Sequence, residues 1–325
     1  MRKCLILCGK VVAVFLVIGL LLELSFRFYV IEFYEPEFAA LNPVQLNEDA
    51  SRPNILFFGD SFTANAGSYV GKLRNELPFN LINSAVSGTG VMEASFMATS
   101  RLAKYDPYIV VYQVYTGNDL LDIRHRSTGD VPFLRRLYHG ISDHIRVLKF
   151  LNYRFGQVKA GWVDDLHTPT AQSELDFSPE LYSNRQKLIF QAEPLHLENV
   201  LELKNGREAE ARILIEGLGK IRNQLDEKSR LVLLLIPHCA EVNSTYHERM
   251  EAIGSRSKKR MNDQFYSLLE SELADVEVLN VRDHFQTQDS IGNRLYYEND
   301  PHLNDNGHSV LADFLKEYLQ KHSTE

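Results

Sequence analysis

The stretch Asn54-Ile55-Leu56-Phe57-Phe58-Gly59-Asp60-Ser61 is the best guide to how this chain folds. Its four central residues, 55–58, are all apolar and lack the polar alternation of a half-exposed strand. A short apolar run that ends at a glycine is typical of a strand buried on both faces. We therefore predict a strand at 54–58 that opens into a loop carrying Asp60 and Ser61.

The sequence on either side repeats this pattern of short apolar runs and longer amphipathic stretches. Strands are predicted at 54–58, 79–83, 108–114, 231–236 and 276–281, and helices at about 69–77, 91–102, 257–274 and 307–320. Apolar strands that alternate with helices indicate a parallel sheet covered on both faces. The predicted fold class is α/β, with a doubly wound parallel sheet.

Composition limits the classes of partner. The 325 residues allow about two domains, or one large domain with an insertion. The chain has a net charge of −8, and residues 1–30 carry +3, which leaves −11 on the remainder. An acidic body argues against nucleic acid as a partner. Cys4 and Cys8 lie close to the N-terminus, so Cys239 is alone in the body, and neither a disulfide framework nor a CxxC metal site is expected.

The N-terminus has the features of a membrane anchor. Residues 11–22 are apolar without a break, and Lys10 can reach the headgroups at one end of a longer span. Glu23 and Arg27, four residues apart, can pair at the other end. No small-residue cleavage site follows the run, which favours an uncleaved signal anchor over a signal peptide. Positive charges precede the run, so the positive-inside rule places residues 31–325 on the outer side, the periplasm in a bacterium.

The predicted organisation is a membrane anchor at 1–30, a linker at 31–52 and an α/β domain at 53–325. Residues at about 124–205 lack a clean period and mix aromatic, histidine, proline and charged residues. They are predicted to form an insertion, either a cap over the site or a packed subdomain. Trp162, the only tryptophan, lies within it.

Polar residues follow three of the predicted strands, at the sheet edge where ligands bind in open α/β folds. The strand ends are Gly59-Asp60-Ser61, Ser87-Gly88-Thr89-Gly90 and Gly117-Asn118-Asp119, and Asp300-Pro301-His302 follows near the C-terminus. Together they supply a hydroxyl, backbone and side-chain amides, and an imidazole beside a carboxylate. Serine-dependent acyl transfer uses these groups.

In residue type and chain order, these segments resemble the SGNH (GDSL-type) hydrolase family. The resemblance covers about 53–123 and 230–320 and implies a flavodoxin-like, three-layer α/β/α fold. It places the nucleophile at Ser61 and the catalytic histidine at His302. The implied oxyanion hole consists of the Ser61 and Gly88 backbone N–H groups and the Asn118 side chain. The implied protein is a membrane-anchored bacterial member of the family.

One departure from the family pattern concerns the third catalytic residue. Many members have Asp three residues before the histidine, where this chain has Asn299. Asp300 lies two residues before His302, and Pro301 favours an extended Asp300, so both side chains can face the same side. Asp300 is the predicted triad member. A Ser–His dyad oriented by a backbone carbonyl is the alternative.

A second departure lies beside Asn118, where Tyr115 occupies the position of the family's usual glycine and Gly117 comes directly before the asparagine. Other polar residues receive structural interpretations. Asp60 and Asp119 are expected to bind loop backbone, His308 to lie at the surface or at a helix start, His238 to have a packing role, and Cys239 to be a small buried residue.

The leading functional prediction is a serine ester hydrolase that deacylates a cell-envelope glycan or a related ester. An O-acetyltransferase acting on cell-surface polysaccharide would use the same residues. A third possibility is a non-catalytic scaffold in envelope-polysaccharide assembly. The expected partners are an acylated carbohydrate or small ester, and the membrane. No HExxH, Walker or dinucleotide-binding pattern occurs, so no metal or cofactor is predicted.

Overall fold

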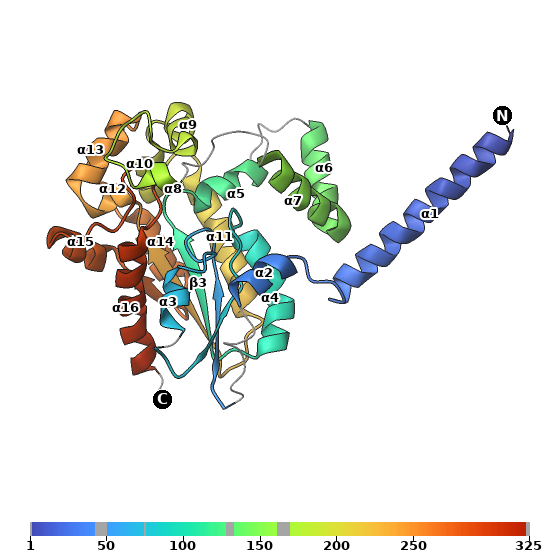
Figure 1. Cartoon of the computed structure of the whole chain (residues 1–325), viewed down its shortest axis with the longest axis horizontal. Helices are drawn as coiled ribbons and strands as arrows, with labels where there is room; N and C mark the ends of the chain where they lie inside the picture. The colour runs from blue at the N-terminus through green and yellow to red at the C-terminus, as the bar shows by residue number, and fades with distance from the viewer. Residues whose placement is uncertain (1, 43–50, 75, 128–132, 161–169, 323–325) are drawn as a thin grey trace. The chain divides into compact units, whose positions relative to one another are not determined.

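A five-stranded sheet is the centre of the larger of two compact units, which comprises residues 36–127 and 165–325. The computed structural model describes residues 2–42, 51–74, 76–127, 133–160 and 170–322. The strands are β1 (Asn54–Phe58), β2 (Asn80–Asn83), β3 (Ile109–Tyr115), β4 (Arg230–Ile236) and β5 (Glu277–Asn280). They lie in the order β2-β1-β3-β4-β5, and every neighbouring pair is parallel (Figure 1). This is the flavodoxin-like order, so the predicted fold class is confirmed.

Burial explains why these apolar runs form strands. All seven residues of β3 are buried, and so are the last four of β1 and the last six of β4. Residue Phe57 of β1 pairs with Asn83 on one side and Val111 on the other. A strand enclosed by neighbours and covered on both faces needs apolar side chains throughout, which is the pattern read from the sequence.

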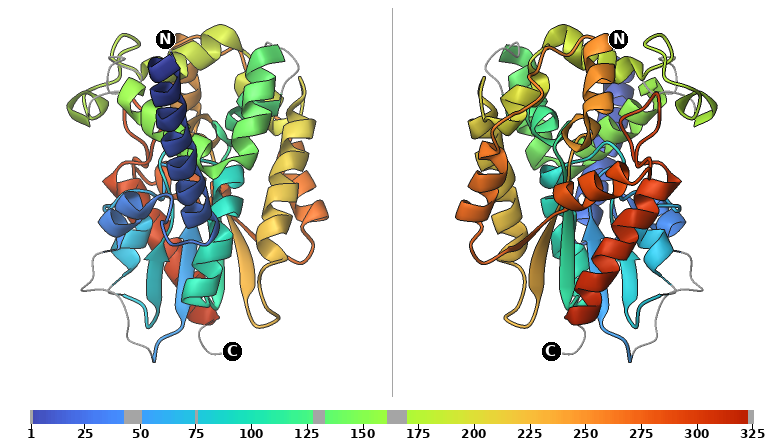
Figure 2. Two further views of the ribbon diagram at one scale, coloured as in Figure 1. Left: turned by 90° about the vertical axis from the view of Figure 1, so that its right-hand side faces the viewer. Right: turned by 90° about the vertical axis from the view of Figure 1, so that its left-hand side faces the viewer.

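Helices cover both faces of the sheet (Figure 2). Helix α3 (Tyr69–Leu73) packs against α16 (Asp305–Lys321) on one face. On the other face, α4 (Val91–Tyr105) packs against α11 (Arg207–Arg222), which also contacts α14 (Gln264–Glu272). These faces form the outer layers of a three-layer α/β/α domain.

Two predicted helices are shorter than expected. Helix α3 ends at Leu73 and not at about residue 77, and residues 257–263 of the predicted helix 257–274 are not helical. Their backbone groups bind polar side chains instead: Ser257 N–H donates to Ser255 Oγ, and Asn262 N–H donates to Glu202. Helix α14 therefore begins at Gln264. Outside the predicted linker and insertion, five helices had no prediction: α5 (Asp119–Ser127), α11, α12 (Cys239–Val242), α13 (Ser244–Ala252) and α15 (Arg282–Ser290).

The insertion predicted at 124–205 divides between the two units. Residues 165–205 belong to the sheet unit, where α8 (Thr170–Ser173), α9 (Asn184–Ala192) and α10 (His196–Leu201) follow α5 (Asp119–Ser127). Residues 128–164 belong to the smaller unit. Residues 128–132 and 161–169 of the insertion, with Trp162, and residues 43–50 of the predicted linker lie outside the described residues. Helix α2 (Glu35–Leu41) occupies part of that linker.

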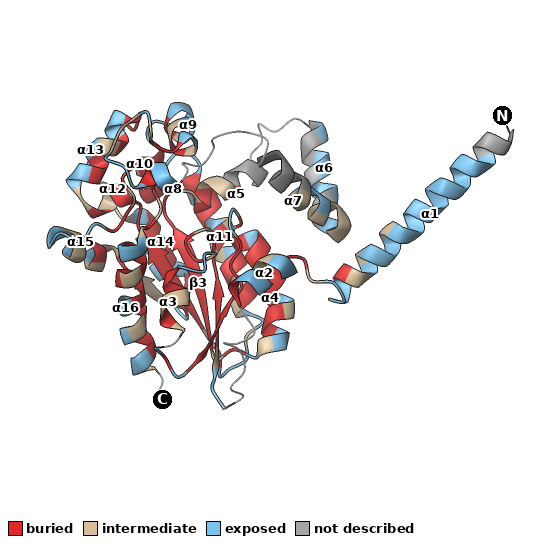
Figure 3. Ribbon diagram, in the orientation of Figure 1, coloured by how far each residue is buried: buried red, intermediate tan, exposed pale blue. Residues whose placement is uncertain are grey.

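The smaller unit, residues 1–35 and 128–164, contains α1 (Arg2–Arg27), α6 (Phe133–His144) and α7 (Arg146–Ala160). Within the described residues, one helix is long and apolar enough to cross a membrane or to serve as a signal sequence, over Ile6–Arg27. Its side chains are exposed along most of their length, in contrast to the buried strands (Figure 3). Arg27 pairs with Glu23 at 2.8 Å, as predicted.

Candidate active site

The turn after β1 places Ser61 at the carboxyl end of the sheet. Asp60 N–H donates to Gln113 Oε1 of β3 at 3.1 Å, and Thr63 Oγ1 donates to the same oxygen. Gly59 is needed there, because a Cβ would lie 2.6 Å from Gln113 Oε1 and 2.7 Å from Thr63 Oγ1. The turn is thereby fixed to the neighbouring strand, with Ser61 partly exposed.

Three of the predicted site residues come together in a hydrogen-bonded chain. Ser61 Oγ lies 2.8 Å from His302 Nε2, and His302 Nδ1 is hydrogen-bonded to Asp300 Oδ1. The same Asp300 oxygen accepts the His302 backbone N–H at 2.9 Å. This is the geometry in which an imidazole removes a proton from a hydroxyl while a carboxylate orients the ring.

The neighbouring carboxylates stabilise the charged form of the His302 ring, although the ring is partly buried. Burial lowers the pKa of His302, but the hydrogen bond and charge of Asp300, together with the charge of Asp60, outweigh it, so the pKa is raised above its ordinary value. The Phe62 ring lies 4.9 Å from the imidazole, centroid to centroid, and limits its rotation. An oriented and more basic imidazole suits a general base.

Asn299 stands where the resemblance led us to expect aspartate, and the structure gives it a different role. Its side chain is fully buried, and its Nδ2 donates to the carbonyls of Gln172, Leu175 and Asp176. Its Oδ1 accepts the Ser178 N–H at 2.9 Å. Asn299 therefore fastens the segment 172–178 of the insertion to the loop that carries Asp300 and His302.

The pocket in front of Ser61 has a volume of about 420 Å³ and a largely polar lining. The lining includes Ser61, Asp300 and His302, with Asn65, Ser87, Ser173, Tyr297, Asp305 and His308. Ser173 belongs to the insertion, so the insertion forms part of the pocket wall.

Two buried carboxylates support the loops behind Ser61. Asp60 Oδ1 accepts the Phe62 N–H at 3.0 Å, and Asp119 Oδ2 accepts the Tyr115 N–H at 3.0 Å. Burial raises the pKa of Asp60 and raises that of Asp119 well above its ordinary value, and the charge of Asp60 adds to the second effect. Both predictions of a loop-binding role are confirmed.

Gly88 and Asn118 lie in the loops that follow the two strands flanking β1. Gly88 follows β2 with φ +71°, and Asn118 follows β3. In the described part of the chain, neither forms a hydrogen bond with Ser61 or His302. The backbone N–H groups of Ser61 and Gly88 donate no hydrogen bond to any described residue, and the Asn118 amide donates one, to Asp122 Oδ2 at 2.8 Å. All three groups therefore retain a donor for a ligand.

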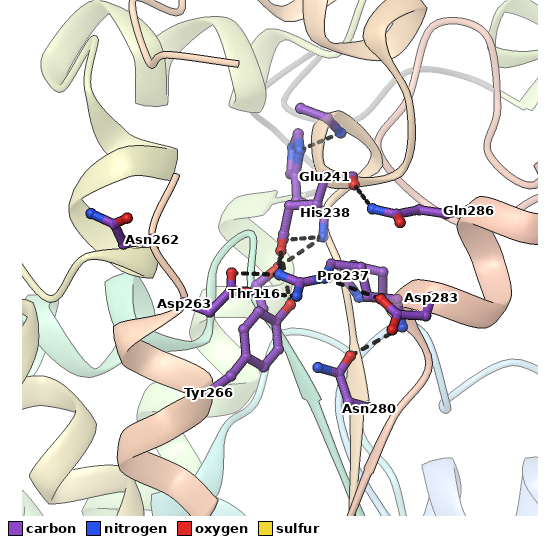
Figure 4. Close-up of polar contacts among 12 residues, drawn as sticks. Thr116, Pro237, His238, Glu241, Asn262, Asp263, Tyr266, Asn280, Asp283 and Gln286 are labelled. Atoms are coloured by element: carbon purple, nitrogen blue, oxygen red, sulfur yellow. Dashed lines mark hydrogen bonds and ion pairs between the residues drawn. The ribbon is translucent and has the colours of Figure 1, made fainter. Parts of the chain in front are cut away.

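A buried polar network fixes the end of β3 just before Asn118 (Figure 4). Glu241 accepts hydrogen bonds from Thr116 Oγ1 at 2.5 Å, from His238 N–H at 2.8 Å and from Tyr266 Oη at 2.8 Å. Nearby, Arg282 binds Asp263 with two nitrogens, at 2.5 and 2.7 Å. The network joins the carboxyl ends of β3 and β4, because Thr116 also accepts the His238 N–H at 2.7 Å.

The insertion supports the same loop from the other side. His196 Nε2 is hydrogen-bonded to the Gly117 carbonyl at 2.7 Å, and Arg185 forms an ion pair with Asp122, the residue that holds Asn118. Gly117 permits close contact with Tyr115, since a Cβ would lie 2.3 Å from that ring. The Tyr115 ring is thus accommodated by the glycine two residues later.

Three further predictions are decided by burial. His308 was expected at the surface or at a helix start; it lies in the first turn of α16, but it is buried and lines the pocket, so the surface alternative is wrong. Burial lowers the pKa of His308 to about 4. His238 packs in the interior, where its Nδ1 accepts the Ala240 N–H, and Cys239 is buried, as predicted.

Sequence reasoning did not find Asp122, Arg185, Asn299 or Ser173 as residues of the site. Asp122 had a usable signal, because it lies four residues after Asn118, the spacing at which two side chains meet on a helix. Arg185 and Ser173 had none, since they come from a segment without a clean period. Among the described residues, no group of three or more His, Cys, Asp or Glu side chains is arranged to hold a metal.

No protein-family model and no curated protein matches this sequence. Similar solved structures include the acetyl xylan esterase AlAXEase, with 13% identity over 82% of this chain and 98% of that chain and a TM-score of 0.43. TesA has 12% identity over 82% and 98%, with a TM-score of 0.40. A GDSL-like lipase from Bacteroides thetaiotaomicron has 12% identity over 89% and 99%, with a TM-score of 0.37. At such low scores, the fold and site described above rest on this chain's own geometry.

Proposed function

We propose that this chain is a membrane-anchored serine ester hydrolase of the SGNH type that removes small acyl groups from a cell-envelope glycan or a related ester. The observation that carries the proposal is the chain of contacts from Ser61 Oγ to His302 Nε2, at 2.8 Å, and from His302 Nδ1 to Asp300. A serine hydroxyl is a weak nucleophile until a base takes its proton.

The proposed reaction has two steps. Ser61 Oγ attacks the ester carbonyl carbon while His302 Nε2 takes the hydroxyl proton, and His302 then gives that proton to the departing alcohol oxygen, leaving an acyl group on Ser61. Water then attacks the carbonyl carbon of the acyl-enzyme while His302 takes its proton, and His302 returns that proton to Ser61 Oγ as the bond to the acyl group breaks and the acid is released. Asp300 orients the imidazole and stabilises its charged form throughout.

Three donors would meet the negative charge on the carbonyl oxygen: the Ser61 and Gly88 N–H groups and the Asn118 amide. They end three adjacent strands, and each has donor capacity that the described residues leave unused. Removing one such donor typically lowers kcat by about 10²–10³.

The substrate class follows from the pocket and from the N-terminal helix. The pocket exposes somewhat more polar than apolar surface, and its lining includes three serine hydroxyls and the carboxylates of Asp300 and Asp305. Such a lining favours a short acyl group on a polar carrier over a long acyl chain. Helix α1 would hold the domain at a membrane, and the positive charges before its apolar run favour a periplasmic location for the sheet unit. Acylated envelope polysaccharide combines a small acyl group, a polar carrier and this location.

The test uses the full chain with p-nitrophenyl acetate and an acetylated oligosaccharide. Ser61→Ala and His302→Ala should each lower kcat/KM by about 10³ or more, since the two residues act as one unit. Ser290→Ala, a hydroxyl removed from the end of α15, serves as the matched control. Turnover that survives in Ser61→Ala would disprove the serine mechanism. If the acyl group passes to an added acceptor sugar in preference to water, the protein is an acyltransferase and the proposal of hydrolysis is wrong.

A further inference from the structure

Helix α6 carries an apolar stripe that the described residues leave uncovered. Leu134, Leu137 and Ile141 follow at the spacing of one helix face and are 76%, 50% and 46% exposed. Tyr138 lies on the same face and is 43% exposed. Polar residues fill most of the remaining positions of the sequence 133–144. A stripe of this width normally faces a core or a membrane surface.

The end of α6 is fastened to the end of the apolar span. Arg27, the last residue of α1, donates to the His144 carbonyl at 2.8 Å. Glu23 accepts the Val147 N–H of α7 at 3.0 Å, and Arg146 donates to the Phe26 carbonyl at 2.5 Å. These contacts all lie within the smaller unit. They fix the junction of α6 and α7 at the level where the span Ile6–Arg27 ends.

Aromatic residues gather at this same level. The Phe150 ring of α7 lies 5.1 Å from Phe26 and 5.3 Å from Phe33, and Tyr153 lies 4.7 Å from Tyr34, centroid to centroid. Aromatic side chains are enriched where a protein crosses from lipid to water. The cluster lies at the end of α1 and on α7, next to the junction at which α6 ends.

The charge of this segment is opposite to that of the whole chain. Residues 133–160 contain six Lys and Arg and one Asp, whereas the whole chain carries −8. A basic segment with an exposed apolar stripe fits the surface of a bilayer that contains anionic lipid.

We propose that α6 lies in the membrane interface beside the anchor, with Leu134, Leu137 and Ile141 inserted among the headgroups of an anionic bilayer. This inference rests on the proposed membrane anchoring by α1. The contact would give the anchored chain a second attachment to the bilayer, one that depends on lipid charge.

Tryptophan fluorescence in vesicles tests the proposal with the full chain. Trp162→Phe removes the native tryptophan, and Leu137→Trp then reports on α6. Leu188→Trp in α9 is the matched control, since Leu188 is 52% exposed in the sheet unit. Phe15→Trp reports on the anchor. The vesicles contain phosphatidylcholine and phosphatidylglycerol, with lipids brominated either close to the headgroup or deep in the chain.

Shallow bromine should quench and blue-shift the emission of Leu137→Trp, deep bromine should quench Phe15→Trp, and neither should quench Leu188→Trp. Without phosphatidylglycerol, quenching at Leu137→Trp should fall and quenching at Phe15→Trp should not. Equal quenching at Leu137→Trp in both lipid mixtures would overturn the dependence on anionic lipid.

The outcomes separate the inference from the anchoring on which it rests. If Phe15→Trp is quenched and Leu137→Trp is not, α6 does not contact lipid and the inference is wrong, while the anchoring stands. If neither is quenched, the anchoring itself fails. Blue-shifted but unquenched emission at Leu137→Trp would mean that protein covers the stripe, which also overturns the proposal. Ile141→Trp replaces Leu137→Trp if the latter does not fold.

Discussion

Residues 133–160 and 170–205 belong to one insertion after β3, yet their apolar side chains have opposite surroundings. Phe190, Leu197 and Val200 in the second segment are at most 2% exposed, whereas Leu134 and Leu137 in the first are 76% and 50% exposed. The second segment reaches the site through Arg185 and His196, and the first is fastened to α1. The two segments are neighbours in the sequence but belong to different structural units. The first packs with α1, and the second packs with the sheet unit.

The largest expected effect lies where the second segment meets the catalytic loop. Asp300→Asn should lower kcat/KM by about 10³–10⁴, because the imidazole loses the carboxylate that orients it. The acid limb of the pH profile should also move to lower pH. The neutral imidazole is the active base, and the substitution removes the group that raises the pKa of His302 while burial, which lowers it, remains.

The measurement is kcat/KM from pH 4 to pH 9, with Asp283→Asn as control, since the Asp283 side chain is 93% exposed. An unchanged plateau would favour a Ser–His dyad. In that case, the loop that Asn299 binds to residues 172–178 would carry Asp300 without needing its carboxylate for catalysis.

The second prediction compares one leucine from each segment. Leu197→Ala should lower the free energy of unfolding by about 2–5 kcal/mol, because it leaves a cavity in a packed core. Leu137→Ala should change it by less than about 0.5 kcal/mol in detergent, because the side chain is half exposed there. Chemical denaturation of both variants measures the difference. Equal losses would show that α6 is packed against protein and would erase the contrast between the segments.

The smallest expected effect concerns Asp122, which accepts a hydrogen bond from the Asn118 amide and forms an ion pair with Arg185 of the second segment. Asp122→Ala releases the Asn118 amide, so kcat should fall by about 10-fold while KM changes little, as expected for a group that acts in the transition state. Asp122→Asn keeps an acceptor for Asn118 and should recover most of the loss. A change confined to KM would mean that Asp122 shapes the pocket and does not position the donor.

The sequence alone was enough to predict the five strands of the sheet and the loops at their ends that carry Ser61, Gly88 and Asn118. Runs such as Ile55 to Phe58 are apolar because both faces of a central strand are covered, and that signal is complete within a few residues. Ser61, Asn118 and His302 were found for a related reason: they stand where apolar runs end or beside a proline. The sequence also pointed to Asp300 as the partner of His302, because Pro301 favours an extended conformation of the residue before it.

Tertiary structure alone decided which distant groups support the site. Arg185 and His196 act on the loop of Asn118 across more than sixty residues, and no local period records such a pairing. His308 shows the same limit: its helix was predicted from its amphipathic pattern, but its burial in the pocket depends on α3 and on the loop of Ser61. The division of the insertion between the smaller unit and the sheet unit likewise follows from contacts between segments far apart in the chain. Such contacts form only in the folded chain, so no local pattern in the sequence records them.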